Sequence, residues 1–97
     1  MFYHNFTETE DHVVLAVCDK NLLGKLLEDE KMSFKVSESF YGTQSIQKDE
    51  LLKKAKKSTI INAVGGDVVS FLIENGFFDQ EKILKIDGVD HAQMVRI

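Results

Sequence analysis

The chain has 97 residues, of which 43% are hydrophobic and 29% are charged, and its formal net charge is −4 at pH 7. This size and composition predict one globular domain around a single core, with no room for a second domain. The longest apolar run, Val13 to Cys18, is far shorter than a membrane span. The negative charge argues against bulk electrostatic attachment to nucleic acid, although a local basic patch is compatible with it.

The beginning of the chain and its cysteine content indicate a compartment. The first residues lack the basic start and long apolar core of a signal peptide, so we expect a cytoplasmic protein with no membrane partner. The single cysteine, Cys18, has no partner for an internal disulfide and lies in an apolar run. We therefore expect it to be a buried structural residue.

The chain opens with two segments that predict an antiparallel hairpin, Phe2 to Thr7 and His12 to Cys18. A two-residue turn at Thr9-Glu10 would place Phe6 opposite Val13. In that register the histidines of the two strands point to opposite faces of the sheet, which argues against a metal site between them.

Short elements follow. Asp19 to Gly24 predicts a turn or a single helical turn that ends at the glycine. Lys25 to Leu27 and Met32 to Val36 predict two extended segments around a charged turn. In the second of these, apolar and polar residues alternate as in a strand with one buried face.

A helical period replaces the alternation in the second half. Gln47 to Lys57 predicts an amphipathic helix with lysines on its outer side. Ser58 to Val64 is apolar and β-branched. A second helix then begins at Asn62 or at Asp67 and is stopped by Asn75-Gly76.

The chain closes with a second hairpin signal. Ile83 to Ile86 predicts a strand, Asp87-Gly88 a two-residue turn, and Ala92 to Ile97 the returning strand. Together these elements predict an α+β fold, a mostly antiparallel sheet with N- and C-terminal hairpins and two main helices packed on it. Two small subsheets sharing one core are the alternative.

No standard catalytic or cofactor signature occurs in the sequence: there is no phosphate loop, Cys-x-x-Cys pair, His-Glu-x-x-His helix or Gly-x-Ser-x-Gly elbow. The sequence predicts neither a cofactor nor a metal site. Asp90-His91 is the best acid–base candidate, but neighbours in a strand point to opposite faces and no nucleophile is evident. Gly65-Gly66 before a helix could bind an anion, but Asp67 would repel a phosphate, which favours a helix-start role.

Two segments carry polar and aromatic groups where turns need only small residues, Ser37 to Gly42 and Gly88 to Gln93. Phe40 and Tyr41 form either an exposed pair that stacks on unpaired bases, or a core Phe40 with the Tyr41 hydroxyl at its rim. Lysines of the first long helix provide the basic concentration, or else a solvated helix face. The candidate binding residues are Ser39, Phe40, Tyr41, Gly42, His91, Gln93, Lys25, Lys53, Lys54 and Lys57.

Three stretches resemble an archaeal family catalogued as domain of unknown function number 424: Leu15 to Asp19 with Leu23 to Lys25, Ser37 to Gly42, and Gly88 to Gln93. The similarity covers nearly the whole chain. Members often carry Pro at the position of Asp90, which speaks against an acid–base role for this residue. The resemblance implies an archaeal cytoplasmic protein with no established activity and a link with translation.

The leading hypothesis is a non-catalytic binding module that engages RNA, a ribonucleoprotein or a protein of the translation apparatus. One alternative is a small enzyme or ligand-binding protein with a pocket around His91. Another is a protein-interaction adaptor or homodimer, which would expose an apolar patch or an unpaired strand edge at Ala92 to Ile97.

Overall fold

The structure is a computed structural model that describes residues 1–96. It contains the strands β1 (Phe2–Glu8), β2 (Val13–Asp19), β3 (Leu26–Glu28), β4 (Ser33–Lys35), β5 (Gln44–Ile46), β6 (Ile60–Val64), β7 (Leu84–Ile86) and β8 (Val89–Val95). The helices are α1 (Glu38–Tyr41), α2 (Lys48–Lys57) and α3 (Gly66–Glu74), with 3₁₀ turns η1 (Lys20–Leu22) and η2 (Gln80–Lys82).

Six strands form one sheet in the order β5-β1-β2-β6-β8-β7, and β3 pairs with β4 in a separate ribbon. β2 and β6 run parallel, whereas the other neighbouring strands of the large sheet run antiparallel. An α+β fold with a mostly antiparallel sheet is therefore confirmed. One large sheet of six strands, rather than two small subsheets, carries the core.

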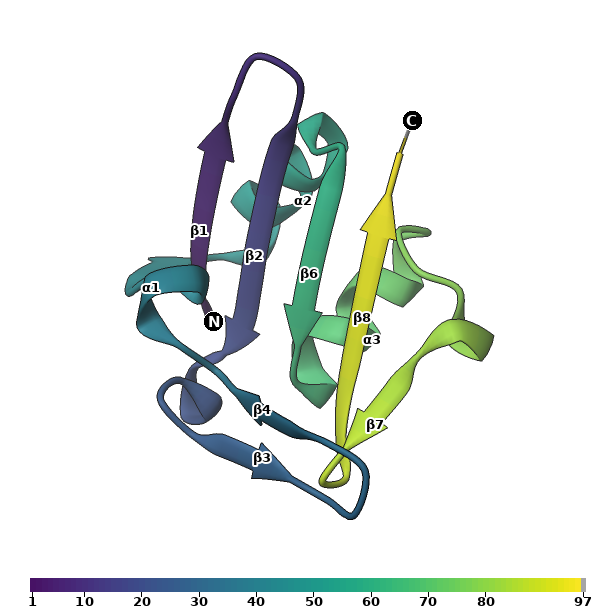
Figure 1. Cartoon of the computed structure of the whole chain (residues 1–97). Coiled ribbons are helices and arrows are strands. Elements are labelled where there is room, and N and C mark those ends of the chain that lie inside the picture. Colours follow the sequence, from purple (N-terminus) through teal and green to yellow (C-terminus); the bar gives the residue numbers. More distant parts are fainter. Residues whose placement is uncertain (97) are drawn as a thin grey trace.

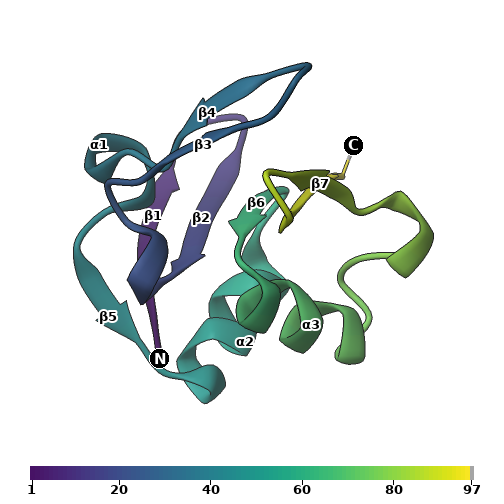
Figure 2. The ribbon, with the colours of Figure 1, turned by 90° about the horizontal axis from the view of Figure 1, so that it is seen from below.

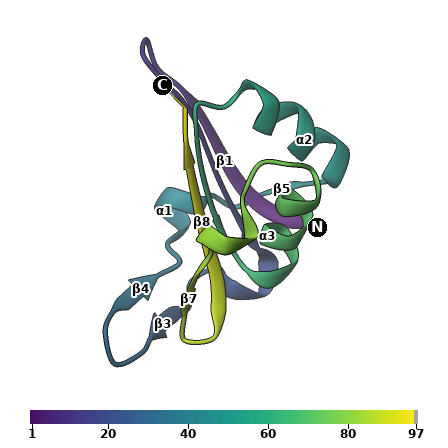
Figure 3. The same ribbon diagram turned by 90° about the vertical axis from the view of Figure 1, so that its right-hand side faces the viewer.

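The sheet has a different covering on each side. α2 and α3 lie together on one side, here called the back face, whereas α1 and the β3–β4 ribbon lie on the other, the front face (Figures 2 and 3). Figure 1 looks onto the front face and shows that α1 and the ribbon cover its lower half. This unequal covering determines which residues are available for binding.

The N-terminal strands pair in a register different from that of a two-residue turn. Phe6 pairs with Leu15 rather than with Val13, because the connection has four residues, Thr9 to His12, closed by a 2.8 Å hydrogen bond from the Thr9 N–H to the His12 carbonyl. His12 consequently lies in the turn, where its Nδ1 is 3.3 Å from the Thr59 hydroxyl. The register expected from a two-residue turn was wrong by two residues.

The second long helix, α3, begins at Gly66, and Asn62 lies inside β6. Of the two expected helix starts, the one at Asp67 is therefore right to within a residue. β8 ends at Val95, and Ile97, which we expected in this strand, lies outside the described residues. Within residues 1–96 no helix has the length and apolar character needed to cross a membrane.

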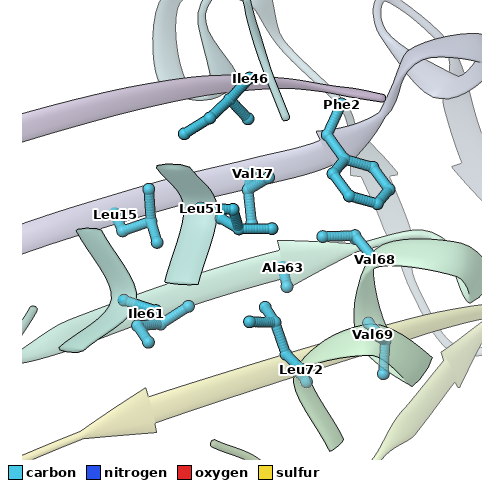
Figure 4. Packing of buried hydrophobic residues seen from close by; sticks show 12 residues of the cluster. Phe2, Leu15, Val17, Ile46, Leu51, Ile61, Ala63, Val68, Val69 and Leu72 are labelled. Atoms are coloured by element: carbon cyan, nitrogen blue, oxygen red, sulfur yellow. The ribbon is translucent and has the colours of Figure 1, made fainter. Parts of the chain in front are cut away.

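Both faces of β2 are buried, which explains its uninterrupted apolar sequence. On the back face, Leu15 and Val17 pack with residues of α2 and α3 such as Leu51 and Leu72 (Figure 4). On the front face, alternate β2 residues belong to a second cluster with Tyr41 and the ribbon. This front cluster contains Ala16, Cys18, Leu22, Leu27, Val36, Tyr41, Val64 and Ile86.

Candidate functional site

The aromatic pair of the first signature segment is split between the core and the surface. Tyr41 is only 1% exposed and belongs to the front cluster, whereas Phe40 is 42% exposed. Their rings meet edge to face, with centroids 4.9 Å apart. Burial raises the pKa of Tyr41 above its usual range. Neither expected arrangement is therefore correct, since consecutive residues of the short helix α1 point in different directions and only Tyr41 reaches the core.

The residues that flank this pair have different roles. Ser39 is exposed and its hydroxyl lies 3.4 Å from that of Ser37. Gly42 adopts a φ of 75°, and a Cβ at this position would collide with the carbonyl of His4. Gly42 therefore lets the chain pass closely over β1.

The second signature segment places its residues on β8. His91 lies on the front face, 5.1 Å from the Phe34 ring between centroids, and burial lowers its pKa. Asp90 forms a 2.9 Å ion pair with Lys85. Gln93 is exposed on the same face as His91. The structure therefore brings Phe40, His91 and Gln93 to one side of the sheet but forms no acid–base pair from Asp90 and His91.

The lysines of α2 lie on the opposite side of the molecule from Phe40 (Figures 2 and 3). Lys53 is exposed and lies 3.4 Å from Glu50. Lys57 is exposed at the C-terminal end of this helix. Lys25 is exposed on the front side, before β3, and its carbonyl accepts a hydrogen bond from Val36. The structure therefore does not unite the helix lysines with the aromatic residues in one surface.

Lys54 is directed inward, towards a buried histidine that the sequence did not identify as important. The Lys54 ammonium is 2.9 Å from Nε2 of His4 and 5.3 Å from the centre of the Phe6 ring. Nδ1 of His4 is 3.0 Å from the Gln44 carbonyl, so the imidazole donates there and accepts from Lys54. Burial, followed by the Lys54 charge, lowers the pKa of His4 despite the hydrogen bond to Gln44. This pair joins α2 to β1.

Above α1 and the ribbon, the front face of the sheet is left uncovered (Figure 1). The residues of the four central strands that point to this side are uncharged there, and most of them are polar or β-branched. We call this surface the front patch; it consists of Asn5, Thr7, Val14, Ile60, Asn62, Gln93 and Val95, with Phe40 beside it. The Asn5 amide, 3.5 Å from the Phe40 carbonyl, connects the helix residue to the strands.

The sequence contained one signal for this patch. Asn62 interrupts the apolar strand β6, and a polar residue with apolar neighbours in such a strand marks a position that faces solvent. Asn5 and Thr7 gave no comparable signal, because their exposure depends on the position of α1.

Of the two cavities described next, only the one beside β8 borders the front patch, through Gln93 and Val95. One of about 460 Å³ opens beside the N-terminus of α3 and has a mixed-charge lining that includes Asp19, Lys20, Lys48, Asp67 and Glu74. A second, of about 290 Å³, lies beside β8. Neither is lined by His91. Residues 1–96 contain no group of three or more His, Cys, Asp or Glu side chains placed to hold a metal ion.

Comparison with known proteins identifies relatives over almost the entire chain. The model of a family described as "Protein of unknown function (DUF424)" matches residues 7–97. The crystal structure of an uncharacterized conserved protein from Methanopyrus kandleri is 33% identical, with a TM-score of 0.79, over 96% of this chain and 89% of that one. No curated protein matches the chain.

Proposed function

Because the chain belongs to the DUF424 family of proteins of unknown function, its activity has to be inferred from its surfaces, and we propose that it is a non-catalytic binding module. The front patch holds a protein partner, with Phe40 as the anchor of the contact. The single observation that supports this proposal is the uncovered half of a sheet whose other half is covered.

The composition of the front patch fits a protein contact. The strand residues of the patch carry no charge and combine side-chain amides with Val and Ile. The centres of protein interfaces are poor in charged residues and rich in aromatic ones. Phe40, exposed at the border of the patch and held by Tyr41 beneath it, provides a fixed aromatic anchor.

A protein is favoured over RNA because the strand residues of the front patch include no lysine or arginine. RNA binding depends on Lys and Arg that neutralise phosphates. Lys53 and Lys54 belong to the back face, and Lys54 is engaged by His4. The link with translation that the family resemblance implies makes a protein of the translation apparatus the first partner to seek.

An enzyme that uses His91 is less well supported. This imidazole packs against Phe34, and the neighbouring carboxylate of Asp90 is paired with Lys85. A general base needs a substrate proton within hydrogen-bond reach, and the two cavities described above are lined by other residues.

Capture from lysate of the native host tests the partner class. The tagged protein is compared with the double variant Phe40→Ala, Thr7→Lys, which truncates the anchor and charges the patch. Lys53→Gln on the back face is the control. Tyr41 is kept, since its loss would open a cavity in the front cluster.

We expect a specific protein to be captured after ribonuclease treatment by the wild type and by Lys53→Gln, but not by the double variant. Recovery that is lost on ribonuclease treatment would assign the module to RNA. Equal recovery by the double variant, folded by circular dichroism, would refute the front patch as the contact surface.

A further inference from the structure

The C-terminal part of β8, after His91, has a free edge. The Arg96 N–H donates to the Thr59 carbonyl over 2.7 Å, and Gly65 donates to the Asp90 carbonyl over 2.9 Å. Even-numbered residues of β8 thus direct their backbone groups towards β6. Backbone groups alternate along a strand, so those of Gln93 and Val95 point to the outer side. β7 pairs with β8 only as far as His91, so no strand of the described chain pairs with these outward groups.

A groove of about 290 Å³ runs along this edge. Its inner wall is the edge of β8, including Met94, and its outer wall comes from the segment between α3 and β7, with Phe77, Phe78 and Ile83. These apolar side chains are partly buried and pack against the hydrophobic core on the back face of the sheet. The groove therefore combines unpaired backbone groups with an apolar floor, the two elements that recognition by strand addition uses.

The shape of the edge favours a single extended segment over a second copy of the whole sheet. In Figures 1 and 3, η2 and the segment before it stand on the outer side of β8, beyond the sheet. The sheet of another copy would meet this segment before the two β8 strands came within the spacing of about 4.8 Å that strand pairing requires. A lone peptide strand needs only the space of the groove between β8 and this segment.

The charge of the groove indicates which residues the bound peptide segment should contain. Lys82 lines the groove, and its ammonium forms no ion pair within residues 1–96. Asp79 also lines it, but its carboxylate accepts the Glu81 N–H. An acidic residue beside the apolar ones would match Lys82.

We propose that the free edge of β8 binds an extended segment of a partner protein as an added strand. The backbone of the segment pairs with Gln93 and Val95, its alternate apolar side chains enter the groove at Phe77, and a neighbouring carboxylate meets Lys82. This inference does not rest on the proposed function, because it uses the outward backbone groups of Gln93 and Val95, whereas the front patch uses their side chains.

A random decapeptide library displayed on phage, selected against the full chain, provides the probe. Val95→Pro removes the outward N–H donor while leaving β6 pairing to the neighbouring residues, as proline is tolerated on edge strands. Val95→Thr is the matched control, because it keeps the N–H and the β-branched shape. Thermal unfolding establishes that both variants are folded.

We expect selected peptides to share alternating apolar residues next to Asp or Glu, and to lose at least tenfold in affinity for Val95→Pro but less than threefold for Val95→Thr. Equal binding to the two variants, or selected peptides without the alternating pattern, would overturn the proposal. A wild-type dimer in solution that Val95→Pro converts to monomer would assign the edge to a second copy and overturn it as well. Phe40→Ala should leave peptide binding unchanged. A failure of the edge proposal can therefore be distinguished from a failure of the front-patch proposal.

Discussion

Removal of the Asp19 carboxylate should destabilise the start of α3. Its two oxygens accept the N–H groups of Asp67 and Val68 over 3.0 and 2.9 Å, so this residue at the end of β2 caps a helix 48 positions later. Loss of a capping residue costs about 0.5–2 kcal/mol, and hydrogen bonds to a charged group contribute roughly 1.5–3 kcal/mol. Because the Asp67 N–H can return to water, we expect Asp19→Ala to cost about 2 kcal/mol.

For a domain of this size, that loss corresponds to a fall in Tm of roughly 8–16 °C. Thermal unfolding followed by circular dichroism measures it, with urea titration as a second determination of the free energy of unfolding. Asp67→Ala is the control, since this exposed residue lies in the first turn of the same helix but supplies no side-chain cap. We expect it to change stability by less than about 0.5 kcal/mol. If Asp67→Ala were as costly as Asp19→Ala, the cap would have been assigned to the wrong residue.

Three further predictions concern buried groups. Gly65→Ala should destabilise by at least about 1–3 kcal/mol in urea unfolding, because φ at this position is 124° and a Cβ would collide with the Asp19 carboxyl; a neutral result would contradict the close approach. Burial lowers the pKa of His4 below its ordinary 6.5, so the unfolded chain takes up the proton first and stability should fall as pH falls through about 6.5. Urea unfolding at pH 7.5 and 5.5 should show a smaller difference for His4→Gln than for the wild type, whereas an equal difference would mean that His4 is not the titrating group. The Cys18 thiol, fully buried with a pKa raised to about 11, should react with a disulfide reagent at pH 8 only after denaturant is added, and rapid reaction of the native protein would contradict its burial.

The local sequence pattern was sufficient to predict the strands and helices, but not the helix caps or the lengths of the turns. The alternation and the amphipathic period of Gln47 to Lys57 predicted strands and the helix α2 within a few residues of their bounds. The four-residue turn after β1 could not be predicted, because the hydrogen bond from Thr9 to His12 replaces the usual glycine signal. The Asp19 cap was missed since it acts across 48 positions, whereas capping signals in sequence are local.

The division of the candidate residues between two faces depends on long-range pairing. β6 lies parallel to β2, and the chain that joins them passes over both faces of the sheet, with the ribbon and α1 on the front and α2 on the back. β5, at the edge of the sheet, separates the two parts, so α2 carries Lys53 and Lys54 to the back, away from Phe40 on α1. Nothing in the sequence near the lysines indicates this crossing at β5. The exposure of the front patch likewise depends on how much of the front face α1 and the ribbon cover.

The affinity of the captured partner for purified variants tests the central proposal most directly. Titration calorimetry with wild type, Phe40→Ala and Lys53→Gln compares the anchor of the front patch with a back-face lysine. We predict at least a tenfold weaker Kd for Phe40→Ala, about 1.4 kcal/mol, and an unchanged Kd for Lys53→Gln. A weaker Kd for Lys53→Gln with Phe40→Ala unaffected would contradict the account and place the contact on the helices of the back face.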